Sequence, residues 1–452
     1  MDWSLVDCFV LDKMSEYRMP GLSLAVVKDG EVIYSRGYGY RNLESMIPAT
    51  PGTVYGIGSI TKSFTALAVM MLHDDGFLDL HDPVAKYGVD LRVLGEPVTI
   101  HHLLTHSSGI PALAYAEAFL MSSFGSELKW LPTSYPEDVI AFMKGYEEWV
   151  DVKPGTKFYY LNEGYVVLGK IVEKVSGVKY EEYIKEKILK PLGMSRTYFS
   201  REEVKRDDDV ATGYIIDREG KHVPKEFPYG VTADGGLLSN PLDMVKYINM
   251  YLGWGRCGNV ELVARKSVEV MEAPHIRLPY ESLTADHYGY GLMVKQDFHG
   301  RRLVGHGGSV GNYTAYIGYV RGDGIGVAIA TNASGYPLSL LGQYILTYAL
   351  GLDPEGLGFR KVERVLSKLT GTYETFKGAM RLVVRGKQPA LVVEQRDKYV
   401  EEITPLTPQV IDEDYALFYV HTLTGRVPVE FRIKENRVEM LYERYKLVKV
   451  GP

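Results

Sequence analysis

The sequence predicts an α+β fold, in which an antiparallel sheet flanked by helices is followed by a small antiparallel β-barrel. Three observations predict it. Strand patterns lie near the start of the chain and again before about residue 335, helix patterns fill the stretch between them, and short strands alone follow about residue 360. Strands from both ends of one segment can close a single sheet around the helices between them. With 452 residues, the chain is longer than one domain usually is.

The first elements are a helix and a hairpin. Residues 3–17 have a helical period that ends at Pro20-Gly21. The apolar run 22–27 leads to Asp29-Gly30, a strong two-residue hairpin signal, and residues 31–34 return from it. We expect this hairpin to form one edge of the main sheet or to lie close to it.

The middle of the first domain is mostly helical. Helices are predicted over 61–73, 98–106, 165–175, 180–189 and 240–251, and strands over 302–305, 314–320 and 326–331. Residues 111–135 have no clean period, and so long an insertion is typical of a functional lid.

The C-terminal segment has a different texture. Short strands are predicted over 380–384, 390–394, 415–421, 429–433 and 438–442, which suits an all-β module. Glycine and proline cluster at 351–359, so we expect one domain over 1–355, with a helical subdomain at about 75–230, and a barrel domain over 360–452.

Composition excludes several classes of protein. Hydrophobic residues make up 46% and charged residues 24%, and the net charge of −6 does not suggest nucleic acid or an anionic membrane as partner. No apolar run approaches the ~20 residues that span a bilayer. The N-terminus has no visible secretory signal, and two cysteines do not make a disulfide framework, so we expect a cytoplasmic protein. Few Asn and Gln residues hint at a thermophile.

Common catalytic and metal motifs are absent. The sequence has no His-Glu-x-x-His, Cys-x-x-Cys or Gly-x-Ser-x-Gly, and Gly37-Tyr38-Gly39 lacks the other glycines of a dinucleotide fingerprint. His102 and His106 are four apart and could be a ligand pair, although capping or core packing explains them better.

A Ser-x-x-Lys motif is the strongest chemical signal. Ser59 lies where the apolar helix 61–73 begins, and Lys62 follows one turn later on the same face. A desolvated lysine can take the proton of a serine, and a helix N-terminus favours the anion that forms. The motif also occurs at Ser126 and Ser176, but the former lies in the irregular insertion and the latter follows a helix.

Two further motifs follow Ser59 in order. They are Tyr160-Leu161-Asn162 and His306-Gly307-Gly308. With these, residues 20–335 resemble the serine β-lactamase and penicillin-binding-protein family, which includes class C β-lactamases, DD-peptidases, D-aminopeptidases and the CubicO group. Three other stretches are similar to that family as well: 101–109, 235–237 and 331–332.

The resemblance implies acyl transfer without a metal or cofactor. Ser59 would attack the carbonyl, and Lys62 and Tyr160 would move protons. The backbone N–H groups of Ser59 and Ser309 would form an oxyanion hole, with Gly308 and Ser309 on the substrate-binding strand. Asn162 would hold Lys62 and the substrate amide.

The same resemblance predicts a peptidase. In the family, His at the position of His306 occurs in DD-peptidases and D-aminopeptidases, and a histidine could help to protonate a leaving amine. We expect a peptide substrate, tolerance of D-residues and poor β-lactamase activity. An esterase of the same fold and a non-hydrolytic penicillin sensor remain alternatives. Aromatic side chains of the insertion would wall the site: Tyr115, Phe119, Phe124 and Trp130.

The tail is a separate resemblance. Gly371-Thr372-Tyr373-Glu374 opens a run of strands that is similar to lipocalin-like C-terminal modules. Archaeal CubicO-type serine peptidases carry such modules and form closed oligomers, so we expect a homo-oligomer. A lid or assembly role suits the barrel better than a ligand of its own.

Overall fold

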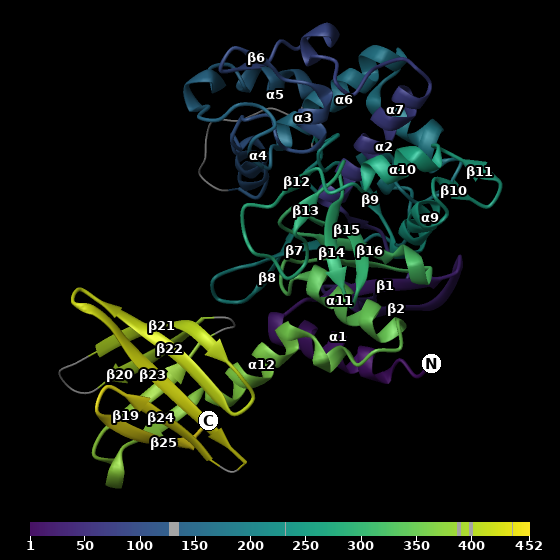
Figure 1. Ribbon diagram of the computed structural model, residues 1–452. Coiled ribbons are helices and arrows are strands. Elements are labelled where there is room, and N and C mark those ends of the chain that lie inside the picture. The colour runs from purple at the N-terminus through teal and green to yellow at the C-terminus, as the bar shows by residue number, and fades with distance from the viewer. Residues whose placement is uncertain (126–134, 231, 387–389, 397–400, 436) are drawn as a thin grey trace. The chain divides into compact units, whose positions relative to one another are not determined.

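The computed structural model describes residues 1–125, 135–230, 232–386, 390–396, 401–435 and 437–452 (Figure 1). The chain divides into two compact units, Met1–Gly351 and Leu352–Pro452. The first holds a large sheet with helices and the second a closed barrel, which confirms the predicted fold class.

Nine strands of the described residues form one antiparallel sheet, in the order β12-β13-β14-β15-β16-β17-β1-β2-β3. Strand β1 (Gly21–Lys28) pairs with β2 (Glu31–Asn42) on one side and β17 (Ile325–Thr331) on the other. The N-terminal hairpin and the late strands therefore share one sheet, as the sequence predicts. The remaining strands are β3 (Ile47–Pro48), β12 (Ile276–Arg277), β13 (His287–Tyr288), β14 (Met293–Phe298), β15 (Arg301–Ser309) and β16 (Thr314–Val320).

Helices cover both faces of this sheet (Figure 1). Tyr316 and Tyr319 point to opposite faces of β16, because they are three residues apart on a strand. Tyr319 stacks on Tyr251 of α9 (Pro241–Leu252), whereas Tyr316 packs against Gly342 of α11 (Leu338–Ala349). Helix α1 (Ser4–Tyr17) packs on α11.

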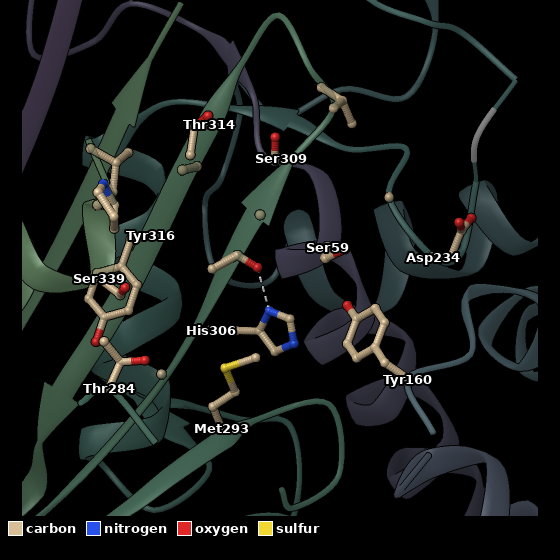
Figure 2. A pocket seen from close by; sticks show the side chains of 18 of the residues that line it. Ser59, Tyr160, Asp234, Thr284, Met293, His306, Ser309, Thr314, Tyr316 and Ser339 are labelled. Carbon is tan, nitrogen blue, oxygen red and sulfur yellow. Dashed lines mark hydrogen bonds between the residues drawn. The ribbon is translucent and has the colours of Figure 1, made fainter. Parts of the chain in front are cut away.

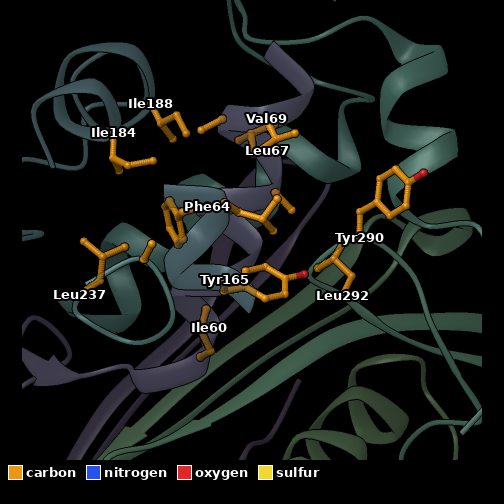
Figure 3. Close-up of a cluster of buried hydrophobic side chains, with 14 of the residues drawn as sticks. Ile60, Phe64, Leu67, Val69, Tyr165, Ile184, Ile188, Leu237, Tyr290 and Leu292 are labelled. Atoms are coloured by element: carbon orange, nitrogen blue, oxygen red, sulfur yellow. The ribbon is translucent and has the colours of Figure 1, made fainter. Parts of the chain in front are cut away.

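Helix α2 (Thr61–Asp74) runs through the centre of the hydrophobic core (Figure 3). Every residue from Thr61 to Met70 is buried, and Phe64 stacks on Tyr247 with ring centroids 3.9 Å apart. A helix packed on all sides is held rigidly, so the residues at its start have a fixed position. The other helices of this unit are α3 (Ile100–Leu104), α4 (Tyr115–Ser123), α5 (Pro136–Phe142), α6 (Asn162–Ser176), α7 (Tyr180–Ile184), α8 (Arg201–Val204) and α10 (Arg265–Met271).

Two predicted elements differ from the structure. Helix α3 is shorter than the predicted 98–106, because Thr99 caps its N-terminus and His106 has a φ of +55°. The insertion 111–135 contains a regular helix, α4, within its described part. Short two-stranded ribbons complete the unit: β4 (Tyr55–Gly56) with β9 (Leu238–Ser239), β5 (Arg92–Val93) with β6 (Glu96–Pro97), β7 (Gly213–Ile216) with β8 (His222–Lys225), and β10 (Arg256–Cys257) with β11 (Val260–Glu261).

The second unit is a closed antiparallel barrel with its own core. Helix α12 (Gly358–Leu369) packs its apolar face, Val365, Leu366 and Leu369, against the barrel interior. The barrel strands are β18 (Gly371–Glu374), β19 (Arg381–Arg385), β20 (Leu391–Arg396), β21 (Glu401–Ile411), β22 (Tyr415–Thr422), β23 (Gly425–Lys434), β24 (Arg437–Tyr442) and β25 (Tyr445–Gly451).

None of the helices in the described part of the chain combines the length and apolar character needed to cross a membrane.

Candidate active site

Ser59 lies in a single 3₁₀ turn, Gly58–Ile60, directly before α2. Lys62 is fully buried, and its Nζ donates to Ser59 Oγ at 3.0 Å and to the main-chain oxygen of Asp234 at 2.7 Å. The hydroxyl therefore has an amine at hydrogen-bonding distance, which is the geometry that a serine nucleophile and its base require.

Strand β15 passes very close to this turn. A Cβ on Gly308 would lie 1.9 Å from the oxygen of Ile57 and 3.0 Å from Ser59 N, and a Cβ on Gly58 would lie 2.7 Å from Ser309 N. Gly58 also has a φ of +50°, which glycine adopts readily. The absence of side chains on these two glycines lets the Ser59 turn and β15 approach closely, and the backbone nitrogens of Ser59 and Ser309 lie at this contact.

Tyr160 lies beside Lys62, whose Nζ is 4.9 Å from the centre of the tyrosine ring. Figure 2 shows the Tyr160 hydroxyl at the end of the ring nearest Ser59. The segment around Tyr160 is held by His106, whose oxygen accepts from Tyr159 N (2.7 Å) and whose Nδ1 accepts from Leu161 N (3.0 Å). His106 also packs its ring 4.2 Å from that of Tyr160.

His306 is buried, and both of its ring nitrogens are hydrogen-bonded. Nδ1 donates to the oxygen of Gly307 (2.5 Å), so Nε2 is the acceptor for the hydroxyl of Tyr288 (3.0 Å). Burial, with the nearby charge of Lys62, lowers the pKa of His306 to about 3. A neutral imidazole with both nitrogens engaged is poorly suited to protonate a leaving amine, so this geometry favours a positioning role for His306.

The predicted site residues other than Lys62 line one cavity of about 470 Å³ (Figure 2). Asn162, the first residue of α6, lines it together with Gly308 and Ser309 of β15. Of the predicted set, Lys62 alone is absent from the lining, because it lies behind Ser59. The described lining residues are Ser59, Ala116, Glu117, Leu120, Tyr160, Asn162, Asp234, Gly235, Thr284, Met293, Leu303, Gly305, His306, Gly307, Gly308, Ser309, Val310, Thr314, Ala315, Tyr316, Pro337, Leu338 and Ser339.

The insertion lines the cavity with residues other than those predicted. Tyr115 and Phe119 are buried in a small cluster with Val139 and Val166, because they lie on the face of α4 that packs against α6. Ala116, Glu117 and Leu120 face the cavity instead. Phe124 packs near Gly311, and Trp130 lies outside the described residues.

Two other candidates, Ser176 and His102, do not line this cavity, whereas His106 packs beside Tyr160. Ser176 ends α6, where its hydroxyl contacts Val178, and Ser126 lies outside the described residues. His102 accepts from Thr99 N in the capping box of α3. Within the described part of the chain, no group of three or more His, Cys, Asp or Glu residues is arranged to hold a metal ion.

Two residues at the cavity were not expected from the sequence. Asp234 is 5% exposed and belongs to the cavity lining, and Figure 2 shows it on the far side of Ser59 from Tyr316. Glu117 lies at the same end, on the exposed side of α4. Asp234 directly precedes the Gly235–Leu237 stretch, and that position was the available signal in the sequence.

The fold and this arrangement define the class of protein: residues 6–346 match the β-lactamase family model, and the chain belongs to that family. Residues 354–448 match a second model, the Pab87 octamerisation domain.

Among solved structures, the chain is similar to the octameric penicillin-binding protein homologue from Pyrococcus abyssi. The two are 50% identical, the match covers 99% of this chain and 100% of the other, and the TM-score is 0.95. Penicillin-binding protein 4* of Bacillus subtilis is 26% identical over 95% of this chain and 94% of its own length. Protein flp of Staphylococcus aureus is 29% identical over 69% of this chain, and the match spans 59% of flp.

Proposed function

We propose that this protein is a serine peptidase that cleaves peptides through an acyl-enzyme on Ser59. The observation that carries the proposal is the bond from Lys62 Nζ to Ser59 Oγ (3.0 Å) at the wall of the cavity that Tyr160 also lines. Membership of the β-lactamase family supports serine hydrolase chemistry in general.

The mechanism follows from the arrangement. Ser59 Oγ attacks the substrate carbonyl while its proton passes to Lys62 or Tyr160, and the oxyanion receives hydrogen bonds from the N–H groups of Ser59 and Ser309. The tetrahedral intermediate then collapses, the carbon–nitrogen bond breaks, and the leaving amine takes that proton. Water repeats the sequence on the ester and releases Ser59. Asn162, which begins α6 and lines the cavity, would hold the substrate amide.

We include tolerance of D-residues next to the scissile bond in the proposal. It is supported by the motif containing His306, which resembles that of DD-peptidases and D-aminopeptidases. A cytoplasmic location is also proposed, since both cysteines, Cys8 and Cys257, are free.

Steady-state rates on four substrate types test this function: matched L- and D-residue peptides, a p-nitrophenyl ester and nitrocefin. We expect peptide cleavage by the wild type, little nitrocefin turnover and no turnover by Ser59→Ala. Ser176→Ala is the matched control, since Ser176 heads the same four-residue motif away from the cavity. Hydrolysis of the ester without cleavage of any peptide would show that the protein is an esterase and not a peptidase. Acylation of Ser59 without turnover would indicate a non-hydrolytic penicillin sensor.

We further propose that the protein forms a homo-oligomer, and specifically an octamer, through residues 354–448. The match of this segment to the Pab87 octamerisation domain supports it, as does the 50% identity to a relative described as octameric.

A further inference from the structure

His106 occupies a backbone position at which glycine is the more common residue. It follows Thr105 at the end of α3, and its φ of +55° lies in the left-handed region that few residues with a side chain adopt. The residue is 1% exposed. A residue in so unusual a conformation persists only where the surrounding structure holds it there, and such residues gather at functional sites.

The imidazole of His106 is neutral, and one of its nitrogens is unpaired. Leu161 N donates to Nδ1 at 3.0 Å, so the ring proton is on Nε2. Nε2 is buried without a hydrogen-bond partner in the described part of the chain. Burial, with the charge of Lys62 nearby, lowers the pKa of His106 well below its ordinary value. A buried donor without a partner costs stability, which indicates that the imidazole serves the groups it contacts.

The ring nearest to this imidazole is that of Tyr160, with centroids 4.2 Å apart. Three other aromatic rings lie farther from His106, at 4.9 to 5.7 Å: Tyr288, Tyr165 and Phe158. Around Tyr160 itself, the rings of Phe158, Tyr288 and His306 are 6.4 to 6.5 Å away. His106 is therefore the closest aromatic support of the Tyr160 ring.

Tyr160 depends on such support, because no hydrogen bond to another described residue holds its hydroxyl. The position of the hydroxyl is then set by ring packing and by the main chain. His106 acts on both, since its main-chain oxygen accepts from Tyr159 N (2.7 Å) and its Nδ1 accepts from Leu161 N (3.0 Å). The peptide nitrogens before and after Tyr160 are thus bound to one residue.

We propose that His106 is a positioning residue for Tyr160, whose ring and flanking peptide groups it fixes so that the hydroxyl can deliver a proton to the leaving amine. This inference rests on the proposed acyl-enzyme function of Ser59. In the step concerned, the proton that Tyr160 has received from Ser59 passes to the leaving nitrogen as the carbon–nitrogen bond breaks. An amine leaves poorly without that proton, whereas p-nitrophenolate leaves without one. A displaced Tyr160 should therefore slow amide cleavage more than ester cleavage.

The test uses a peptide p-nitroanilide and the p-nitrophenyl ester of the same acyl group, with kcat/KM as the measure of acylation. His106→Phe keeps an aromatic ring but removes the acceptor of Leu161 N. We expect kcat/KM to fall about 100-fold on the amide and less than about 5-fold on the ester. In His106→Asn the side-chain oxygen can still accept, and asparagine tolerates a positive φ, so the amide should lose less than about 10-fold.

His102→Phe is the matched control. It removes the same kind of bond, from Thr99 N to a histidine Nδ1, in the same helix but away from the cavity. We expect it to change the ratio of amide to ester cleavage by less than about 2-fold. A double-mutant cycle with Tyr160→Phe completes the test. In that background His106→Phe should have little further effect on the amide, because the hydroxyl that it positions is already absent.

Two results would overturn the inference. One is an equal fall of kcat/KM on amide and ester in His106→Phe, which would show a structural role alone. The other is the full loss on the amide in the Tyr160→Phe background, which would show that His106 does not act through the Tyr160 hydroxyl. If thermal unfolding shows that His106→Phe does not fold, His106→Ala takes its place with the same expectations. Failure of a fluorophosphonate to label Ser59 in the wild type would instead contradict the proposed function.

Discussion

At the scale of single residues, the site depends on side chains that are held by hydrogen bonds on more than one side. Lys62 Nζ has two acceptors, His306 has a partner at each ring nitrogen, and His106 binds the backbone on both sides of Tyr160. Such groups keep their geometry before substrate arrives, and this preorganisation is the main source of electrostatic catalysis.

Replacing Lys62 by Met tests the base directly. Met has a similar length but cannot take a proton or donate to Ser59 Oγ, so we expect kcat/KM to fall by about 10²- to 10⁴-fold. The Asp234 oxygen would lose its donor, at a cost of about 1–3 kcal/mol in stability. Steady-state kinetics and urea unfolding measure the two effects. Lys179→Met is the control, because Lys179 ends the Ser176 motif and is exposed; an equal loss of activity there would contradict the assignment.

His306 should make the protein less stable in acid. Its pKa is about 3 in the folded state, whereas an unfolded histidine titrates near 6.5. The unfolded chain therefore binds the proton first, and stability is lost as pH falls from about 6.5 towards 3, by about 1.4 kcal/mol per pH unit. His306→Gln removes this dependence while leaving the other buried histidines unchanged. The free energies of unfolding of the wild type and His306→Gln, measured at pH 7.5, 6 and 5, should approach each other as the pH falls. Two parallel curves would contradict the low pKa of His306 in the folded state.

At the scale of elements, the sequence was most informative where a pattern was long. The helix at 61–73 was predicted almost to its ends because its apolar period covers three turns, and the hairpin before it was marked by Asp29-Gly30. Strands β12 and β13 were missed because two residues each, including charged or polar ones, have no readable alternation.

The same reasoning explains which site residues could be predicted. Ser59, Tyr160 and His306 lie in short motifs with recognisable flanks, and each motif begins or ends a regular element. Asp234 and Glu117 reach the cavity only through tertiary packing, since a single carboxyl in a loop or on an exposed helix face has no pattern of its own. The prediction that aromatic residues of the insertion wall the site was wrong for Tyr115 and Phe119 for a related reason. Tertiary packing buries both side chains in a small hydrophobic cluster.

The close contact between β15 and the Ser59 turn should not accommodate a side chain at position 308. A Cβ on Gly308 would overlap the Ile57 oxygen at 1.9 Å, so Gly308→Ala must displace the strand and with it the proposed oxyanion donor, Ser309 N. We expect a loss in kcat of about 10²- to 10³-fold. Gly307→Ala is the neighbouring control, because the nearest atom to its Cβ would be 3.9 Å away. Kinetics with thermal unfolding separate displacement from misfolding, and equal kcat values for the two variants would contradict the proposed contact.

At the scale of the whole molecule, the chain joins a unit that contains the cavity to a barrel with a separate core. Barrel strands pair only with one another among the described residues, and their interior is filled by Leu, Val and Phe side chains. A filled interior suits a surface used for assembly better than a ligand-binding barrel.

A chain that ends at Gly351 should therefore fold and keep its reactive serine but lose the proposed assembly. The division at Gly351 leaves each unit with its own hydrophobic core. Light scattering on the full and shortened chains measures the assembly, and fluorophosphonate labelling measures the site. The same number of subunits in the shortened and the full-length protein would show that residues 354–448 do not hold the subunits together.

The central claim is that Ser59 is the nucleophile, and intact-mass spectrometry after incubation with a fluorophosphonate tests it most directly. We predict one adduct per chain, placed on Ser59 by peptide mapping, with none on Ser59→Ala and full labelling of Ser176→Ala. An adduct on another serine, or equal labelling of Ser59→Ala, would contradict the account.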